Sequence, residues 1–395
     1  MAWVEQVGEH SYRVRYAVDG RVRSVSGFAS RREANDYALD LESDRRRGRW
    51  IDPAAGRLTV GEWARRWLGT LDLDTRTVEN YGHRIGRHIQ PRWGVVPLRD
   101  ITVSAVTIWR NELLGWLAPG TVRGVLTVLS MMLDDAVDER LIAANPVRRR
   151  RRRGRRHRGA PPREKIWATP EEVLRVADRA TLLGGYGCGL LIVTAGWTGA
   201  RWGELAGLHR DRVDVRRRRI RIDRDTGCLH EGAHALWLGP PKTQASAREI
   251  LLPPFLVRLL RDYLATTDGE MVFTSPQGHW LRRSCFDRRV FRPAADGNAH
   301  LGNARVRTEP AIPGLTIHGL QHGHKTWMIA DGIPEIAQAV RLGHHLDDRV
   351  AEIYSHVAPE VERRLLRALE RRWKQAVKVV SREGVQTQTP WSQVT

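Results

Sequence analysis

Cysteine and long apolar segments are scarce in this chain of 395 residues. The three cysteines, Cys188, Cys228 and Cys285, lie far apart and include no CxxC pair. A disulfide framework and a zinc site are therefore both unexpected, which fits a reducing compartment. No N-terminal apolar segment resembles a signal peptide, and no apolar run reaches the ~18 residues that suggest a membrane span. We expect a soluble intracellular protein.

Positive charge is abundant, with 65 Lys+Arg against 45 Asp+Glu and a net charge of +20. Because 41% of the residues are hydrophobic, we expect two or three folded domains with a polyanionic partner rather than a disordered chain. The basic residues are nearly all arginine, because the only lysines are Lys165, Lys242, Lys325, Lys374 and Lys378. Arginine binds phosphate with a bidentate fork, but a GC-rich genome explains so strong a bias more readily.

Residues 1–55 are predicted to form a small unit of three strands and one helix. The strands are expected at residues 4–7, 12–18 and 21–27, and Asp19-Gly20 between the last two is a strong hairpin signal. The capping box Ser30-Arg31-Arg32-Glu33 starts a helix that runs to about Arg47. The strands carry Arg13, Arg15, Arg21 and Arg23. These arginines form either a DNA-binding surface or a solvated charged face.

Residues 57–146 are predicted to be helical, starting from the capping box Thr59-Val60-Gly61-Glu62. Apolar residues at helical spacing indicate four amphipathic helices, with breaks at Pro91, Pro97 and Pro119-Gly120. A linker follows at residues 147–166, with nine arginines between Arg148 and Arg158. So dense a like-charge block cannot pack into a core. It either lies along DNA phosphates or serves as a nuclear localisation signal. The DNA contacts are assigned to Arg148, Arg149, Arg150, Arg151, Arg152 and Arg153.

Residues 167–376 are predicted to form a third region, whose first helix is capped by Thr169-Pro170-Glu171-Glu172. This region should be largely helical, with a β-hairpin near residues 218–252. Residues 357–374 predict an amphipathic helix that packs either on its own chain or on a neighbouring copy. Residues 377–395 have no periodicity and should form a flexible tail. The expected fold is mainly α with small β parts.

Five residues in the second half of the chain together indicate one chemistry. They are Arg201 in TGARWGELAGL, Lys242 in PPKTQASAREI, His318 in HGLQH, His344 in LGHH and Tyr354 in EIYSH. A tyrosine on an amphipathic helix is usually half-buried packing, but packing does not explain this order and spacing. Glu204 is expected to orient Arg201, either as a buried ion pair or beside an anion held near a helix start. A lysine could act as an acid where arginine could not.

This set resembles the catalytic half of the tyrosine recombinases, the phage-integrase family, and the resemblance covers roughly residues 1–375. It implies an arm-type DNA-binding domain, a four-helix core-binding domain and a mixed α/β catalytic domain. In the family the matching arginine holds the scissile phosphate, the lysine protonates the leaving 5′ oxygen, and the tyrosine attacks to form a 3′-phosphotyrosine. His318 would be the base, and His322 would support it. We see no carboxylate cluster, and the resemblance implies neither metal nor cofactor.

One position departs from the family pattern. The second catalytic arginine, expected three residues after His318, is Gln321, which brings neither a charge nor a five-donor fork. Loss of such a donor typically lowers a rate on the order of 10²–10⁵-fold. Lys325, one helical turn further on, could partly substitute. The alternatives are an impaired integrase relic or inactivated variant that only binds DNA, and a strand-passing enzyme of the topoisomerase IB type.

The resemblance also implies partners. These are double-stranded DNA attachment sites, a homotetramer assembled on DNA, an excision factor and a DNA-bending host protein, with no membrane. It implies a site-specific recombinase for integration and excision of a phage or other mobile element. The expected location is the bacterial cytoplasm, at the nucleoid.

Overall fold

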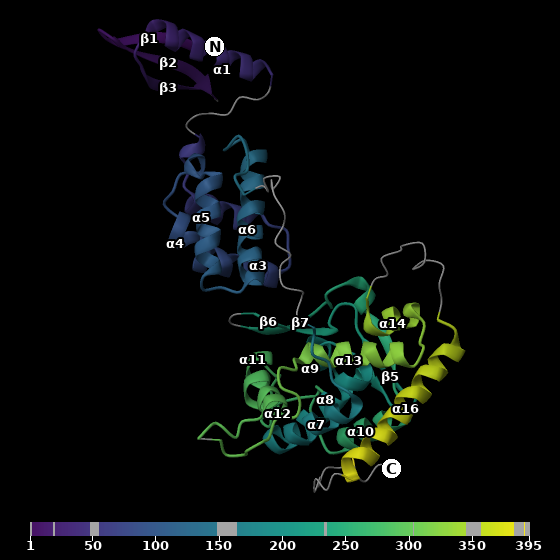
Figure 1. The fold of residues 1–395 in the computed structure, drawn as a ribbon. Coiled ribbons are helices and arrows are strands. Elements are labelled where there is room, and N and C mark those ends of the chain that lie inside the picture. The colour runs from purple at the N-terminus through teal and green to yellow at the C-terminus, as the bar shows by residue number, and fades with distance from the viewer. Residues whose placement is uncertain are drawn as a thin grey trace. The chain divides into compact units, whose positions relative to one another are not determined.

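The computed structural model describes residues 2–18, 20–47, 55–147, 164–232, 235–302, 304–344, 357–382 and 391. The chain divides into two compact units, Met1–His157 and Arg158–Thr395. The first unit contains two separate hydrophobic clusters, one in its three-stranded sheet and one in its helices. The second unit contains one large cluster. Figure 1 gives the positions of the elements along the chain.

The N-terminal residues form an antiparallel sheet backed by a helix, as predicted. The strands are β1 (Ala2–Gly8), β2 (Ser11–Val18) and β3 (Arg21–Phe28), in that order, and α1 (Arg31–Arg46) contacts all three. The hydroxyl of Ser30 caps α1 by accepting a hydrogen bond from the Glu33 N–H at 3.1 Å. Val14 is fully buried between the sheet and Ala34 of the helix.

The strand arginines lie on two different faces of this sheet. Residues that face each other across two strands point to the same side. Arg23 faces the buried Tyr16 across β2 and β3, so it lies on the helix side. Arg21 is two residues earlier on β3 and therefore lies on the same side. Arg13 and Arg15 point to the open side, where both pair with Glu5, at 2.7 and 3.4 Å. The open face therefore carries two of the four predicted DNA-binding arginines.

The second cluster is enclosed by helices. They are α2 (Val60–Thr70), α3 (Thr75–Arg84), α4 (Gln90–Trp93), α5 (Val103–Leu114) and α6 (Pro119–Asp138), with 3₁₀ turns at Ala55–Arg57 and Leu98–Asp100. The capping box at Thr59 is present as predicted. The predicted break at Pro91 is wrong, because a π-helical turn, Ile85–Ile89, joins α3 to α4. Pro91 lies in the first turn of α4, where its missing N–H is tolerated.

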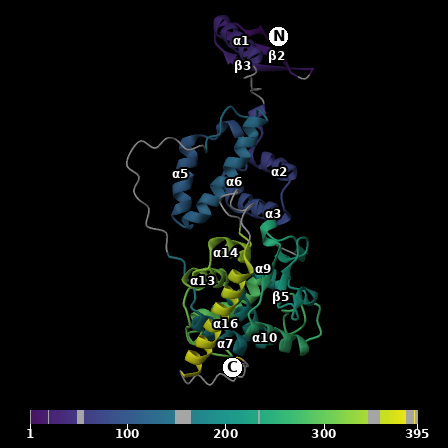
Figure 2. The same cartoon turned by 90° about the vertical axis from the view of Figure 1, so that its right-hand side faces the viewer.

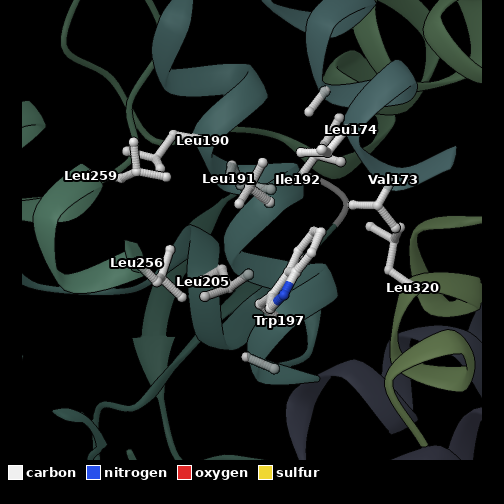
Figure 3. Packing of buried hydrophobic residues seen from close by; sticks show 14 of the residues in the cluster. Val173, Leu174, Leu190, Leu191, Ile192, Trp197, Leu205, Leu256, Leu259 and Leu320 are labelled. Atoms are coloured by element: carbon white, nitrogen blue, oxygen red, sulfur yellow. The ribbon is translucent and has the colours of Figure 1, made fainter. Parts of the chain in front are cut away.

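The second unit is built around α8 (Tyr186–Thr198), whose residues are all buried from Cys188 onward. Three helices pack against α8: α7 (Pro170–Gly184), α10 (Pro254–Ala265) and α13 (Ile317–Ala330). Figure 3 shows leucine and valine side chains of these helices around Trp197. The ring of Trp197 also makes edge contacts with Phe255 and Trp373. This core fixes the end of α8, from which the candidate site begins.

Two small sheets lie beside this core. The first has the order β4 (Val213–Asp214), β5 (Arg219–Ile222) and β8 (Arg248–Leu251); the second is a hairpin of β6 (Cys228–Glu231) and β7 (Leu236–Gly239). The predicted β-hairpin near residues 218–252 is present as the β6–β7 pair, whereas the pairing of β5 with β8 was not predicted. Ile220 pairs with Ile250 and both are fully buried, which brings β5 and β8 together, and the β6–β7 hairpin is inserted between them.

The remaining helices complete the second unit. They are α9 (Trp202–Ala206), α11 (Arg283–Phe286), α12 (Arg292–Asp296), α14 (Glu335–Leu342) and α16 (Pro359–Arg382), with a π turn at Asp287–Phe291 and 3₁₀ turns at Arg210–Arg212 and Gln244–Ser246. None of the helices in the described ranges is long and apolar enough to cross a membrane.

The C-terminal helix α16 packs on its own chain, against α7 and α10 (Figures 1 and 2). The ring of Trp373 stacks on Phe255, with ring centroids 4.0 Å apart. A flexible tail from residue 377 is wrong, because the buried positions continue at Val377 and Val380. Trp391 is also buried, and its indole N–H donates to a carboxylate oxygen of Asp178 at 2.6 Å. The apolar face of α16 is thus covered in cis.

Candidate active site

The turn after α8 positions Arg201. Helix α8 ends at Gly199, whose φ of 67° is left-handed. A Cβ at Gly199 would lie 2.5 Å from Leu342, so only glycine fits this turn. Arg201 follows as the residue that caps α9, with its backbone N–H donating to a carboxylate oxygen of Glu204 at 2.9 Å. The predicted helix start at Arg201 and the predicted pairing with Glu204 are both present.

The guanidinium of Arg201 joins three segments that are far apart in sequence. One terminal nitrogen donates to the Glu204 carboxylate and to the Ser246 hydroxyl, both at 3.0 Å. The other donates to the Gly343 carbonyl at 3.1 Å, which places Arg201 next to His344. The side chain is 24% exposed. A guanidinium has five N–H donors, and within the described ranges two of those of Arg201 make no hydrogen bond.

Arg248 is a site residue that the sequence interpretation missed. It forms two hydrogen bonds with the Glu204 carboxylate, at 3.1 and 3.0 Å, and its Nε donates to the Arg341 carbonyl at 2.7 Å. The side chains of Arg248 and Glu204 are 4% and 1% exposed. Glu204 is therefore held between two guanidiniums, and Arg201 cannot turn away from the site. Because side chains alternate along a strand, Arg248 shares the inward face of β8 with the buried Ile250. A charged residue on that apolar face was the sequence signal that could have identified Arg248 as a site residue.

His344 directly follows the end of α14. Gly343 closes this helix with a left-handed φ of 62°. A Cβ there would lie 2.8 Å from the Ser246 backbone and 2.9 Å from the Arg248 guanidinium. The backbone at Gly343 therefore lies directly against the Arg201–Arg248 cluster, and His344, which is exposed, begins at that point.

His318 and His322 lie on one face of α13. Their rings meet edge to face, with centroids 4.7 Å apart. On another side of the helix the backbone of residues 166–168 crosses close to α13, where a Cβ at Gly319 would lie 2.8 Å from the Ile166 carbonyl and one at Gly323 2.7 Å from the Ala168 carbonyl. This crossing brings Lys165 to the two histidines.

All three histidines have lowered pKa values, first because each is partly removed from water. Positive neighbours lower them further: Lys165, Arg201 and Arg283 act on His318, whereas Arg201, Lys325 and Arg248 act on His344. The pKa of His322 is lowered in the same way. The permanently charged groups that shift these pKa values, Lys165, Lys325, Arg201, Arg248 and Arg283, are cations. The site therefore presents neutral imidazoles in a positive field, which favours an anionic ligand.

Gln321 does not point to the open side of α13. Its side chain is buried, and the amide Nε2 donates to the Gly199 carbonyl at 2.9 Å. Gln321 thus braces the turn that carries Arg201. The neighbouring His324 is also buried; its Nδ1 donates to the Gly196 carbonyl, so its Nε2 accepts from Arg341 at 2.8 Å. Burial lowers the pKa of Arg341 to about 9, which leaves it charged at neutral pH.

Lys242 is exposed and follows β7, in the loop that leads through Ser246 to β8. It is not in the β6–β7 turn, but its loop reaches Arg201 through Ser246. Tyr354 and Arg148–Arg153 lie outside the described residues. Among the described side chains, no group of three or more His, Cys, Asp or Glu is arranged to hold a metal ion.

Comparison with known proteins assigns this arrangement to a family. Residues 172–360 match the phage integrase family, and residues 59–114 match its N-terminal SAM-like domain. The integrase of Mycobacterium phage L5 is 29% identical over 299 residues, covering 74% of this chain and 73% of that protein. The chain belongs to the phage integrase family, the tyrosine recombinases.

Solved structures share the fold. A Tn1549 transposon integrase in complex with transposon right end DNA aligns with a TM-score of 0.59 and 17% identity, over 78% of this chain and 98% of that one. A lambda integrase tetramer bound to a Holliday junction aligns with a TM-score of 0.52 and 17% identity, over 89% and 94%. The predicted mainly helical architecture, with an N-terminal three-stranded sheet, is confirmed.

Proposed function

We propose that this site-specific DNA recombinase cuts and rejoins duplex DNA through a covalent 3′-phosphotyrosine, for integration and excision of a mobile element. The observation that carries the proposal is the position of Arg201. Its guanidinium is locked by Glu204 and Ser246, is bonded to the residue before His344, and lies in a positive field with His318. Such a site fits a phosphodiester, whose transition state places negative charge on the non-bridging oxygens.

The proposed reaction replaces one phosphodiester bond with a bond between phosphorus and the tyrosine oxygen. The Tyr354 phenolic oxygen attacks the scissile phosphorus, and the bond from phosphorus to the 5′ oxygen breaks. The tyrosine proton goes to His318, and Lys242 donates a proton to the leaving 5′ oxygen. A tyrosine with an ordinary pKa near 10 needs such a base, and the lowered pKa of His318 leaves its imidazole neutral and ready to accept. Attack by the free 5′ hydroxyl of another strand reverses these steps.

The rest of the chain is proposed to hold the DNA. Residues 1–55 would bind arm sites through the open sheet face with Arg13 and Arg15, and residues 57–146 would bind the core site. The linker, residues 147–166, would lie along phosphates. The catalytic domain is taken as 167–376. The lambda integrase relative forms a tetramer on a Holliday junction, and we extend a homotetramer on DNA attachment sites to this protein, with an excision factor and a DNA-bending host protein as partners.

A nicked suicide substrate tests the proposal. Cleavage next to the nick releases a short fragment, so the covalent protein–DNA adduct accumulates and is counted on a denaturing gel. The wild-type chain should form the adduct, and Tyr354→Phe should bind the same DNA with nearly equal affinity and form none. An adduct in the phenylalanine variant would assign the attack to another residue.

A binding-only relic is the second candidate, favoured by the inward position of Gln321, which adds no third guanidinium to the Arg201–Arg248 cluster. Tight binding to attachment-site DNA with no adduct from the wild-type chain would select this candidate. A topoisomerase of type IB would instead relax supercoils without any need for a specific site.

A further inference from the structure

Arg201 by itself provides little positive charge to a phosphodiester. Three of its five N–H donors are bonded to Glu204, Ser246 and Gly343, and its charge is shared with a carboxylate. The nearby Arg248 is committed in the same way and is buried. Gln321 is neutral and directed inward. A second cation is therefore needed to balance the charge that a pentacoordinate phosphorus places on its two non-bridging oxygens.

Helix α13 displays one candidate on its open face. His318, His322 and Lys325 follow the spacing i, i+4 and i+7, so they form one stripe along the helix. The buried side of the helix carries Leu320, His324, Trp327 and Met328. Gln321, one helical turn before Lys325, is buried against the Gly199 carbonyl. Lys325 is half-exposed, and within the described ranges its ammonium makes no hydrogen bond and no ion pair.

The part of α13 that carries Lys325 packs on the turn that positions Arg201, because Gln321, one helical turn earlier, bonds to Gly199 in that turn. The charge of Lys325 also lowers the pKa values of two histidines. It acts on His322, on its own helix, and on His344, after the end of α14. The other cations that act on His344 are Arg201 and the committed Arg248. Lys165 and Arg283 lower the pKa of His318. Within the described ranges, Lys325 is therefore an uncommitted cation on the part of α13 that packs on the turn carrying Arg201.

We propose that Lys325 is a catalytic residue that contacts a non-bridging oxygen of the scissile phosphate and supplies the second positive charge of the site. This inference rests on the proposed function. It assigns to a lysine on α13 the charge that position 321 lacks. The ammonium neutralises the phosphate and transfers no proton, so its role differs from that of Lys242.

The first test compares rates of adduct formation on the suicide substrate. Lys325→Ala should be slower than wild type by about 10²–10³-fold, as expected for loss of a charged transition-state donor. Lys325→Arg keeps the charge and should retain much of the rate. Lys378→Ala removes the same charge from α16, away from the site, and should match wild type. Thermal unfolding midpoints of all variants check that each one folds.

The second test removes the charge from the substrate instead. A methylphosphonate at the scissile position replaces one non-bridging oxygen with a methyl group, which makes the linkage neutral. A second cation then has less negative charge to balance, so the gap between Lys325→Ala and wild type should shrink to within about threefold. A loss of rate through mere misfolding would persist on this substrate.

The outcomes separate the two proposals. Equal rates for wild type and Lys325→Ala would overturn the role of Lys325 and leave the recombinase function standing. A large loss in Lys165→Ala with none in Lys325→Ala would assign the charge to Lys165 instead. A wild-type chain that binds DNA but forms no adduct would overturn both the proposed cleavage and the contribution of Lys325.

Discussion

At the scale of single residues, Gln321 shows how one side chain takes a structural role where the family pattern has a catalytic one. Its amide donates to the carbonyl of Gly199, in a turn whose residues are buried. Removing that donor leaves a buried carbonyl unsatisfied, which typically destabilises a protein by about 1–3 kcal/mol. Arg201 is two residues further along the same turn, so stability and site geometry are linked there.

Gln321→Arg is expected to add a guanidinium beside His318. In the Lys325→Ala background it should restore about a hundredfold in cleavage rate, equivalent to ~3 kcal/mol of transition-state stabilisation. In the wild-type background the gain should be smaller, because Lys325 already supplies a charge. DNA affinity should change little, since one charge is added to a protein of net charge +20. Suicide-substrate rates for the four chains give the comparison; no gain in either background would show that the longer side chain cannot leave the buried position.

The pH dependence of stability follows from the histidines. His324 is fully buried and its pKa lies well below the ordinary value of 6.5, first because of burial and then because of Arg341. Above the unfolded pKa the full stability is present. As the pH falls below about 6.5, the unfolded chain takes up protons that the folded chain does not, so stability is lost. Each such imidazole lowers the free energy of unfolding by up to about 1.4 kcal/mol per pH unit.

Denaturant unfolding between pH 7.5 and 5 measures this loss, and His324→Gln should make the dependence shallower. An unchanged slope in that variant would assign the effect to His318, His322 and His344, whose pKa values are lowered as well.

At the scale of elements, the site depends on three chain segments that Arg248 ties together. Arg248→Gln would leave Glu204 buried with one guanidinium fewer, and breaking a buried pair typically destabilises by about 3–5 kcal/mol. We expect a loss near the lower end, because Arg201 still pairs with Glu204. Arg221→Gln, an exposed change on the adjacent strand β5, should stay within about 0.5 kcal/mol. Chemical denaturation of both variants measures the change in the free energy of unfolding. Equal losses of stability would show that Arg248 does not hold the three segments together.

The elements also show what the sequence could predict and where it could not. The N-terminal strands and the helix starts at Ser30, Thr59 and Thr169 depend on alternation and local caps, which neighbouring residues determine. The pairing of β5 with β8 depends on a contact between Ile220 and Ile250 across an inserted hairpin, which no local pattern reveals.

The same distinction applies to the site. The pairing of Arg201 with Glu204 could be predicted from their i, i+3 spacing at a helix start. The inward direction of Gln321 and the bonds of Arg248 could not, because both depend on tertiary partners more than 40 residues away.

At the scale of the whole molecule, the arm-binding assignment of the N-terminal unit can be tested by deletion. Residues 1–55 contain a sheet and a helix with their own buried cluster, around Val14 and Ala34. Removing them should spare binding and cleavage at core sites and abolish tight binding to separate arm sites. Gel-shift titrations with core and arm duplexes at fixed salt provide the measurement. Loss of core-site binding would instead make this unit part of the clamp around the cleaved DNA.

Because the molecule has so few lysines, the chemical reactivity of each one can be followed separately when DNA binds. Of its five lysines, Lys165 and Lys325 adjoin the histidines and Lys242 lies on the loop that carries Ser246, whereas Lys374 and Lys378 are exposed on α16. Mild acetylation followed by peptide mass mapping would therefore compare the reactivity of the three lysines near the site with that of Lys374 and Lys378 on the same chain. Bound DNA should block acetylation of the first three amines and leave the two on α16 reactive. The acetylation levels of the five lysines would then report whether DNA occupies the site.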